Sequence, residues 1–180
     1  AGTGGAVSSA EPPSRLEQLA ERFELPLDAP AQLERLLDLV ASDPLAPTTV
    51  RDQAIAVDAH VADALVALDL EPVRAADRIA DLGSGAGFPG LVLAAALPQA
   101  EVALVESARR KCAFLERAAA VMGLENVAVV CERAEAWTAG LGAEDVVTAR
   151  AVASLNVLVE YAAPLLREAG ALVAWKGRRD

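Results

Sequence analysis

Short apolar runs alternate with longer amphipathic segments from residue 79 onward. The runs are typical of buried strands, and the segments between them repeat apolar residues every three or four positions, as helices do. Because strand and helix alternate, we predict an α/β fold with a parallel sheet and helices on both faces. The predicted strands are Ile79 to Leu82, Glu101 to Glu106, Val127 to Cys131, Val146 to Ala149 and Ala171 to Trp175.

Helical patterns precede the first strand. Ser14 can cap one helix, a second follows Pro26, and a third lies between Pro47 and Pro72. The expected buried stripes are Leu16, Leu19, Ala20 and Phe23, then Leu33, Leu36, Leu37 and Val40, then Val57, Val61, Leu65 and Leu68. We therefore divide the chain into a disordered tail at 1–13, a helical lead-in at 14–72 and a core at 73–180, the last two forming one compact domain.

The glycine-rich segment after the first strand is typical of a nucleotide-binding turn. Its dinucleotide pattern G-x-G-x-x-G holds when counted from Gly85, but fails when counted from Gly83, where the strand ends, because Phe88 takes the third position. Asp81 would repel a pyrophosphate and would suit the ammonium and sulfonium of S-adenosylmethionine, directly or through water. We therefore predict S-adenosylmethionine; the alternatives are NAD and a tight turn that binds nothing.

An acidic residue ends the second strand. Glu106 lies 21 residues beyond Gly85, where nucleotide-binding folds place the carboxylate that binds ribose hydroxyls. The alternative is that Glu106 only balances Arg109 or Arg110. The glycine-rich segment and the spacing of Glu106 from Gly85 together favour a cofactor site.

A basic cluster opens the helix that follows. Ser107 can cap this helix, which ends at Gly123, and its first turn holds Arg109-Arg110-Lys111, the unfavourable sign for a helix N-terminus. Either a phosphate backbone or nearby acids could offset these charges, and both interpretations stay open. The expected buried stripe is Cys112, Leu115, Ala119 and Met122.

Further candidates lie at the ends of the third and fourth strands. Ala134 and Glu135 follow the third strand and could contact an adenine, and Arg150 ends the fourth, where it could bind a carboxylate, a phosphate or the substrate base. A structural ion pair is the alternative for Arg150. The single histidine, His60, lies three residues before Asp63 on a predicted helix; it either faces a ligand or, as we favour, bonds to Asp63.

Composition narrows the choice of partner and compartment. The net charge of −10 argues against avid, non-specific RNA binding, although a local basic patch remains compatible with it. No apolar run is long enough to span a membrane, and the start of the chain does not look like a signal peptide. Cys112 and Cys131 lack neighbours at metal-ligand spacing, so we expect both to be reduced in a core, as in a cytoplasmic protein, and we expect no metal.

Three segments together resemble one family. They are Ile79 to Gly90, Leu104 to Ser107, and Thr148 to Leu155; Thr49 to Arg51 and His60 to Asp63 add to the likeness. The chain resembles the bacterial ribosomal RNA small-subunit methyltransferase G family, also called glucose-inhibited division protein B, from about residue 14 to 177. Thr48 and Ala64 depart from the family's usual residues, so we assign these two positions no role.

The resemblance implies a Rossmann-like class I methyltransferase that transfers a methyl group from S-adenosylmethionine to N7 of a guanine in 16S ribosomal RNA. The substrate would be the small ribosomal subunit, and we expect a cytoplasmic monomer. By similarity, the cofactor would contact Gly83, Phe88, Ala134, Glu135 and Arg150; Arg150 is also the candidate catalytic residue. Guanine N7 carries a free lone pair, so no general base is required.

The main alternative is a small-molecule S-adenosylmethionine-dependent methyltransferase, which the acidic charge and the 3% aromatic content favour. A metal site or a base near the glycine segment would support this alternative, whereas a basic rim from Arg109, Lys111, Lys176 and Arg178 would support an RNA substrate.

We also expect a helix from Ser154 to Leu166 and a turn at 168–170 before the last strand. That strand would have an open edge, which suggests that C-terminal strands are missing from this sequence.

Overall fold

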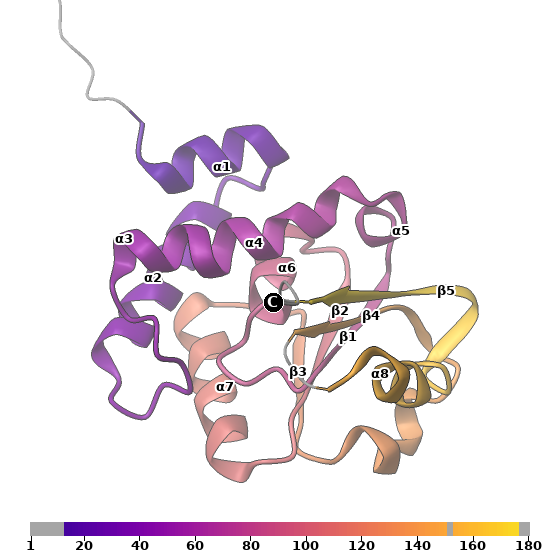
Figure 1. Cartoon of the computed structure of the whole chain (residues 1–180). Coiled ribbons are helices and arrows are strands. Elements are labelled where there is room, and N and C mark those ends of the chain that lie inside the picture. The colour runs from indigo at the N-terminus through magenta and orange to yellow at the C-terminus, as the bar shows by residue number, and fades with distance from the viewer. Residues whose placement is uncertain (1–12, 151–152, 177–180) are drawn as a thin grey trace, which may run out of the picture.

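The computed structural model describes residues 13–150 and 153–176. Its five strands form one parallel sheet in the order β3-β2-β1-β4-β5 (Figure 1). The strand order reverses at β1, which lies between β2 and β4, so the carboxyl ends of these strands form the crevice where such folds bind ligands. The predicted α/β fold is confirmed. The strands are β1 (Arg78–Leu82), β2 (Glu101–Val105), β3 (Val127–Val130), β4 (Glu144–Arg150) and β5 (Leu166–Trp175).

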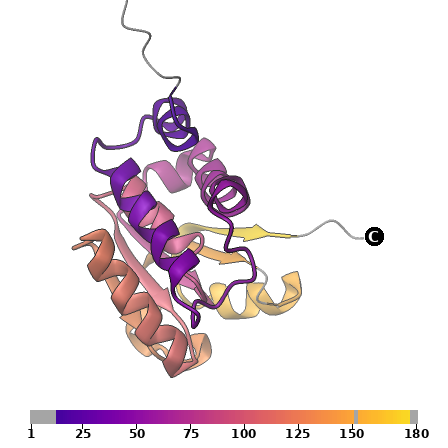
Figure 2. The same ribbon diagram turned by 90° about the vertical axis from the view of Figure 1, so that its left-hand side faces the viewer.

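Helices cover both faces of the sheet (Figures 1 and 2). On one face, buried side chains of α1 (Arg15–Phe23), α2 (Ala29–Ser42), α6 (Gly90–Ala96) and α7 (Arg109–Met122) form a continuous apolar cluster with the sheet. On the other, α8 (Leu155–Ala162) and the turn that carries Trp137 pack against Ala80, Leu82, Val147 and Ala149. None of the helices in the described part of the chain has the length and apolar character to cross a membrane.

The predicted cap of the first helix and two of the three predicted buried stripes are confirmed. Ser14 caps α1 through a reciprocal pair of hydrogen bonds with Glu17, and the expected stripes of α2 and of the third helical run are buried. That third run is continuous but irregular: it comprises α3 (Gln53–Ala56), a π-helix (Val57–Ala62), α4 (Asp63–Leu65) and a 3₁₀ helix (Val66–Asp69), and α5 (Glu71–Arg74) follows. The predicted tail falls almost wholly on residues 1–12, outside the described part.

Three predictions about local structure were wrong. Ser107 does not cap α7; the cap position is Ala108, whose N–H donates to the side chain of Glu106. The last helix ends at Ala162, and β5 already begins at Leu166. The predicted turn at 168–170 is instead a bulge within β5, since Leu166 pairs with Glu144 and Ala171 with Val146. Ala169 has a φ of 63° in this bulge, which the local pattern did not reveal.

The expectation that both cysteines are reduced in a core was also wrong. Cys112 and Cys131 form a disulfide, with their Cα atoms 5.8 Å apart. Cys112 is buried in α7, whereas Cys131 follows β3 and is exposed. The parallel pairing of β2 with β3 brings the start of α7 beside the end of β3, a proximity that the separation of 19 residues does not disclose.

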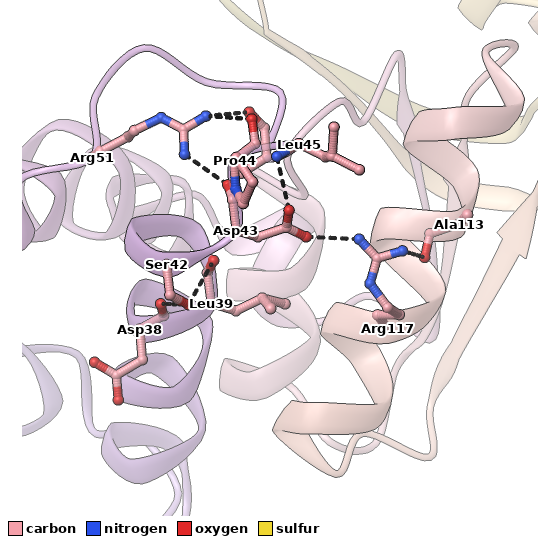
Figure 3. A network of polar contacts seen from close by, with 10 residues as sticks. Asp38, Leu39, Ser42, Asp43, Pro44, Leu45, Arg51, Ala113 and Arg117 are labelled. Atoms are coloured by element: carbon pink, nitrogen blue, oxygen red, sulfur yellow. Dashed lines mark hydrogen bonds and ion pairs between the residues drawn. The ribbon is translucent and has the colours of Figure 1, made fainter.

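A polar network ties the lead-in to α7 (Figure 3). The carboxylate of Asp43 accepts hydrogen bonds from the backbone N–H of Leu45 at 2.8 Å and from the guanidinium of Arg117 on α7 at 2.7 Å. The guanidinium of Arg51 donates to the carbonyl oxygens of Asp43 and Pro44 in the same loop. These contacts fix the proline-containing loop that leads into the third helical run.

The glycine segment is fastened to the sheet by a buried carboxylate. Asp81 on β1 accepts hydrogen bonds from the Gly90 N–H at 3.2 Å and from the Thr148 hydroxyl of β4 at 2.8 Å. Gly90 opens α6 against this carboxylate and against Leu104, with no room for a side chain. One acid thus joins two strands to the start of the crossover helix.

We predict that Gly90→Ala destabilises the protein by about 1–3 kcal/mol, because the added methyl overpacks a closed site. Its Cβ would lie against Leu104 Cδ2 and 2.8 Å from Asp81 Oδ2. Chemical unfolding measures the effect. Gly123→Ala is the comparison: there the strain is confined to the backbone, whose φ is 72°, and no atom lies within 4 Å of the new Cβ. An unchanged unfolding midpoint for Gly90→Ala would contradict the tight packing.

Candidate functional site

A cavity of about 250 Å³ opens at the carboxyl ends of the strands. It brings together four predicted residues from separate segments: Gly83 after β1, Glu106 after β2, and Ala134 and Glu135 after β3. This is the crevice beside the reversal of strand order, where open α/β sheets bind ligands. Among the described residues, the lining comprises Leu82, Gly83, Val105, Glu106, Ser107, Glu132, Arg133, Ala134, Glu135, Ala153 and Tyr161.

Two glycines form the turn at the end of β1, and one of them, Gly83, lines the cavity. Gly83 and Gly85 have φ values of 66° and 57°, a left-handed conformation that glycine adopts at little cost. The Gly83 N–H donates to the carbonyl of Val105 at 2.8 Å, and the Gly85 N–H donates to Glu106 Oε2 at 3.2 Å. Gly85 itself is not in the cavity lining. The loop is thus fixed to the end of β2.

Glu106 is the polar anchor of the cavity. Its side chain is buried; Oε1 accepts from the Ala108 N–H at 2.9 Å, and Oε2 lies 3.6 Å from Lys111 Nζ. Glu106 therefore does form an ion pair, as in the alternative interpretation of the sequence, but its partner is Lys111 instead of Arg109 or Arg110. A carboxylate offers about four acceptor positions, so Glu106 retains capacity for ligand hydroxyls.

The charge of the cavity discriminates between ligand classes. Glu106, Glu132 and Glu135 line it, and the only cation in the described lining, Arg133, lies 3.8 Å from Glu135. A diphosphate would meet repulsion from these carboxylates, whereas a cation or a donor of hydroxyl and amino hydrogen bonds would be attracted. The lining fits a positively charged nucleoside better than a dinucleotide.

Asp81 lies beneath the glycine loop and outside the cavity lining. Its side chain is 1% exposed, and burial is the main cause that raises its pKa from 3.8 to about 6, against hydrogen bonds that lower it. Both carboxylate oxygens accept hydrogen bonds from the protein. Direct contact between Asp81 and a cofactor remains a prediction; in this structure the residue holds the loop.

Phe88 and Arg150 form a second cluster, beside the third helical run. The Phe88 ring stacks on the His60 imidazole with centroids 4.4 Å apart, and the Arg150 guanidinium lies 5.6 Å from the Phe88 centroid. Arg150 forms an ion pair with Asp63 at 3.3 Å, which is the structural ion pair that the sequence analysis gave as the alternative to ligand binding. The favoured bond between His60 and Asp63 was wrong: His60 faces Arg150 on one side and Thr48 on the other.

Two residues without a predicted role take part in these contacts. Thr148 bonds to Asp81, its partner in the register of β1 with β4, and Thr48 bonds to His60. A threonine within the apolar run of β4 was the available signal for the first. No local signal marked Thr48, since it meets His60 only after the chain has folded.

We predict that Asp81→Asn removes part of the pH dependence of stability. The pKa of Asp81 is higher in the folded protein, at about 6, than its ordinary value of 3.8, so the folded state binds the proton more tightly. The stabilisation is full below about pH 4 and is lost as the pH rises through 6. From pH 4 to pH 8 the wild type should lose roughly 2 kcal/mol more unfolding free energy than the variant. Parallel pH profiles in urea would contradict this.

Comparison with known proteins places this geometry in a family. The family model described as rRNA small subunit methyltransferase G (GidB) matches residues 34–180. A Sorangium cellulosum protein named ribosomal RNA small subunit methyltransferase G is 44% identical over 135 residues, 73% of this chain and 56% of that protein. A protein of the same name from Halorhodospira halophila is 43% identical over 172 residues, 93% of this chain and 80% of that protein.

The chain spans about half the length of the first two curated relatives that it matches, 56% and 46%. Among solved structures, a coclaurine N-methyltransferase bound to N-methylheliamine and SAH is similar, with a TM-score of 0.53 and 16% identity, over 92% of this chain and 48% of that one. This likeness concerns the fold alone. The resemblance seen in the sequence is confirmed by the family model, and the chain belongs to the rRNA small subunit methyltransferase G (GidB) family.

Proposed function

We propose that this protein transfers the methyl group of S-adenosylmethionine to N7 of a guanine in 16S ribosomal RNA, acting as a monomer on the small subunit. The observation that carries the proposal is the acidic cavity at the carboxyl ends of the strands, in a chain of the methyltransferase G family. The relatives are named for methylation of small-subunit ribosomal RNA.

The donor fits the residues of the cavity. Glu106 would accept hydrogen bonds from the ribose hydroxyls, and Ala134 and Glu135 would receive the adenine, whose amino group donates. Gly83 would let the donor approach the backbone closely. Phe88 and Arg150, which lie outside the cavity lining, would also contact the donor. S-adenosylmethionine supplies an electrophilic methyl on a sulfonium, and the carboxylates of the lining favour its positive charge.

The reaction requires positioning more than proton transfer. The lone pair of guanine N7 attacks the methyl carbon in line with the departing sulfur, and no proton has to leave before the attack. The described lining offers carboxylates but neither histidine nor lysine. Arg150 ends β4 at the same edge of the sheet, and it would orient the base by donating to its acceptors.

Recognition of RNA requires a basic surface on an acidic protein. Lys111 is engaged by Glu106, whereas Arg109 and Arg110 are exposed at the start of α7 and have no ion pair within residues 13–150 and 153–176. The Lys176 side chain donates to the carbonyl of Ala153, and Arg178 lies outside the described residues. Arg109 and Arg110 are therefore the candidates for phosphate contact beside the cavity.

Methyl transfer to small subunits tests the proposal. Subunits from cells that lack the enzyme are incubated with labelled S-adenosylmethionine, and the modified base is mapped. We expect one labelled guanine, and we expect Gly83→Asp to reduce transfer by about 100-fold or more, because it adds bulk and negative charge at the cavity wall. Gly142→Asp is the matched control: φ is 63° there and 66° at Gly83, and Gly142 lies outside the cavity lining.

Two results would contradict the proposal. Absence of label from the subunits, with label appearing in a small molecule of a cell extract, would favour a small-molecule methyltransferase. Equal activity in Gly83→Asp and Gly142→Asp would place the methyl donor elsewhere on the protein.

A charge reversal tests the basic patch separately. Arg109→Glu with Arg110→Glu should weaken binding to small subunits and reduce the slope of log affinity against log salt by about 2, with affinity for S-adenosylhomocysteine unchanged. Arg15→Glu with Arg22→Glu on α1 changes the net charge equally and serves as the control. If both double variants lose the same affinity for small subunits and show the same salt dependence, Arg109 and Arg110 have no specific role in RNA binding.

A further inference from the structure

His60 is buried between two predicted cofactor residues. It is the single histidine of the sequence and is 7% exposed. Its ring stacks on Phe88 with an interplanar angle of 19°, and its Nδ1 lies 3.3 Å from an Arg150 guanidinium nitrogen. The residue thus touches the loop after β1 and the end of β4 at once.

The surrounding donors define the tautomer of His60. A guanidinium can only donate, so Nδ1 must present a lone pair to Arg150. The proton then lies on Nε2 and is donated to the Thr48 hydroxyl oxygen at 3.2 Å, which also accepts from the Val50 N–H. The imidazole is therefore neutral and held at both nitrogens.

The backbone around His60 departs from regular helix. Residues Val57–Ala62 form a π-helix inside a longer helical run. Segments of π-helix are rare in proteins, and those that occur are often found at functional sites. Here the segment carries the carbonyl of Ala59, which accepts from Arg150, as well as His60 itself. The irregular turn thus supplies two of the groups that hold Arg150, and Asp63 supplies a third.

We propose that His60 is a positioning residue: as a neutral imidazole it orients Phe88 and Arg150 for the methyl donor and couples the helical lead-in to the site. This inference rests on the proposed function, and it adds a residue and a protonation state to it. His60 acts through Phe88 and Arg150 and takes no part in the chemistry.

Protonation of His60 would undo this arrangement. An imidazolium has no lone pair for Arg150 and would place two cations 3.3 Å apart. The charged groups that face His60 are Arg150 from β4 and Asp63 from its own helical run, while Phe88 covers its ring. Burial first, and then Arg150, hold the pKa of His60 below 6.5, so the neutral form prevails at neutral pH. Donor binding should therefore weaken as the pH falls through that pKa.

Nuclear magnetic resonance tests the arrangement directly, because one histidine gives one set of ring signals. Protein labelled with ¹⁵N-histidine and freed of any histidine tag should show the Nε2–H tautomer and a pKa below 6.5. Arg150→Met should raise that pKa, and S-adenosylhomocysteine should shift the ring signals. A proton on Nδ1, or a His60 pKa that is the same in the wild type and in Arg150→Met, would overturn the proposal.

Three variants separate the ring from its nitrogen. His60→Phe keeps a ring for stacking but loses the acceptor, and should raise the Kd for S-adenosylhomocysteine about tenfold. His60→Ala should raise it further, and His60→Asn, which presents an amide oxygen near the place of Nδ1, should recover part of that loss. The affinity of the wild type for S-adenosylhomocysteine should fall as the pH is lowered, and the affinity of His60→Phe should change much less over the same pH range. Thermal unfolding verifies that each variant is folded.

The outcomes distinguish this inference from the proposed function. If the wild type does not bind S-adenosylhomocysteine, the proposed function fails, while the tautomer and the effect of Arg150→Met still show whether His60 holds Arg150. If the wild type binds but the three folded variants bind equally well with the same pH profile, His60 is not a positioning residue.

Discussion

The buried carboxylate of Asp81 is the constraint on which the site depends. It accepts hydrogen bonds from β4 and from the first residue of α6, so one group fixes the strand, its neighbour and the crossover helix. Its burial is costly, as the raised pKa indicates, and two specific donors offset that cost. Because the glycine loop is held from below in this way, its upper side is free to face the cavity.

Two clusters lie near the carboxyl ends of the strands. The acidic cavity gathers Glu106 with the turn after β3, and the aromatic and cationic cluster gathers Phe88 and Arg150 with His60. The first has the chemistry to hold a cationic nucleoside, and the second lies where the lead-in meets the sheet. The lead-in therefore contributes His60 to the second cluster as well as covering the sheet, and it is linked to α7 through Asp43 and Arg117 (Figure 3).

Local pattern was sufficient for much of the fold, because apolar runs bounded by glycines or polar residues leave few alternatives to buried strands. It placed the cavity too, since parallel strands end at one edge and Gly83, Glu106 and Glu135 each follow a strand end. What failed depends on contacts between distant segments. The start of β5 is decided by pairing with Glu144, the disulfide by the pairing of β2 with β3, and the partner of His60 by the approach of Arg150. Competition between side chains also matters, because the side chain of Glu106, and not that of Ser107, accepts a hydrogen bond at the start of α7, from the N–H of the cap residue Ala108.

The central claim is that the acidic cavity accepts a positively charged methyl donor and rejects a diphosphate carrier. Isothermal titration calorimetry with S-adenosylmethionine, S-adenosylhomocysteine and NADH measures this most directly. The geometry predicts a single site that binds both sulfur compounds and shows no measurable heat with NADH. Tight uptake of NADH together with indifference to S-adenosylhomocysteine would contradict the account.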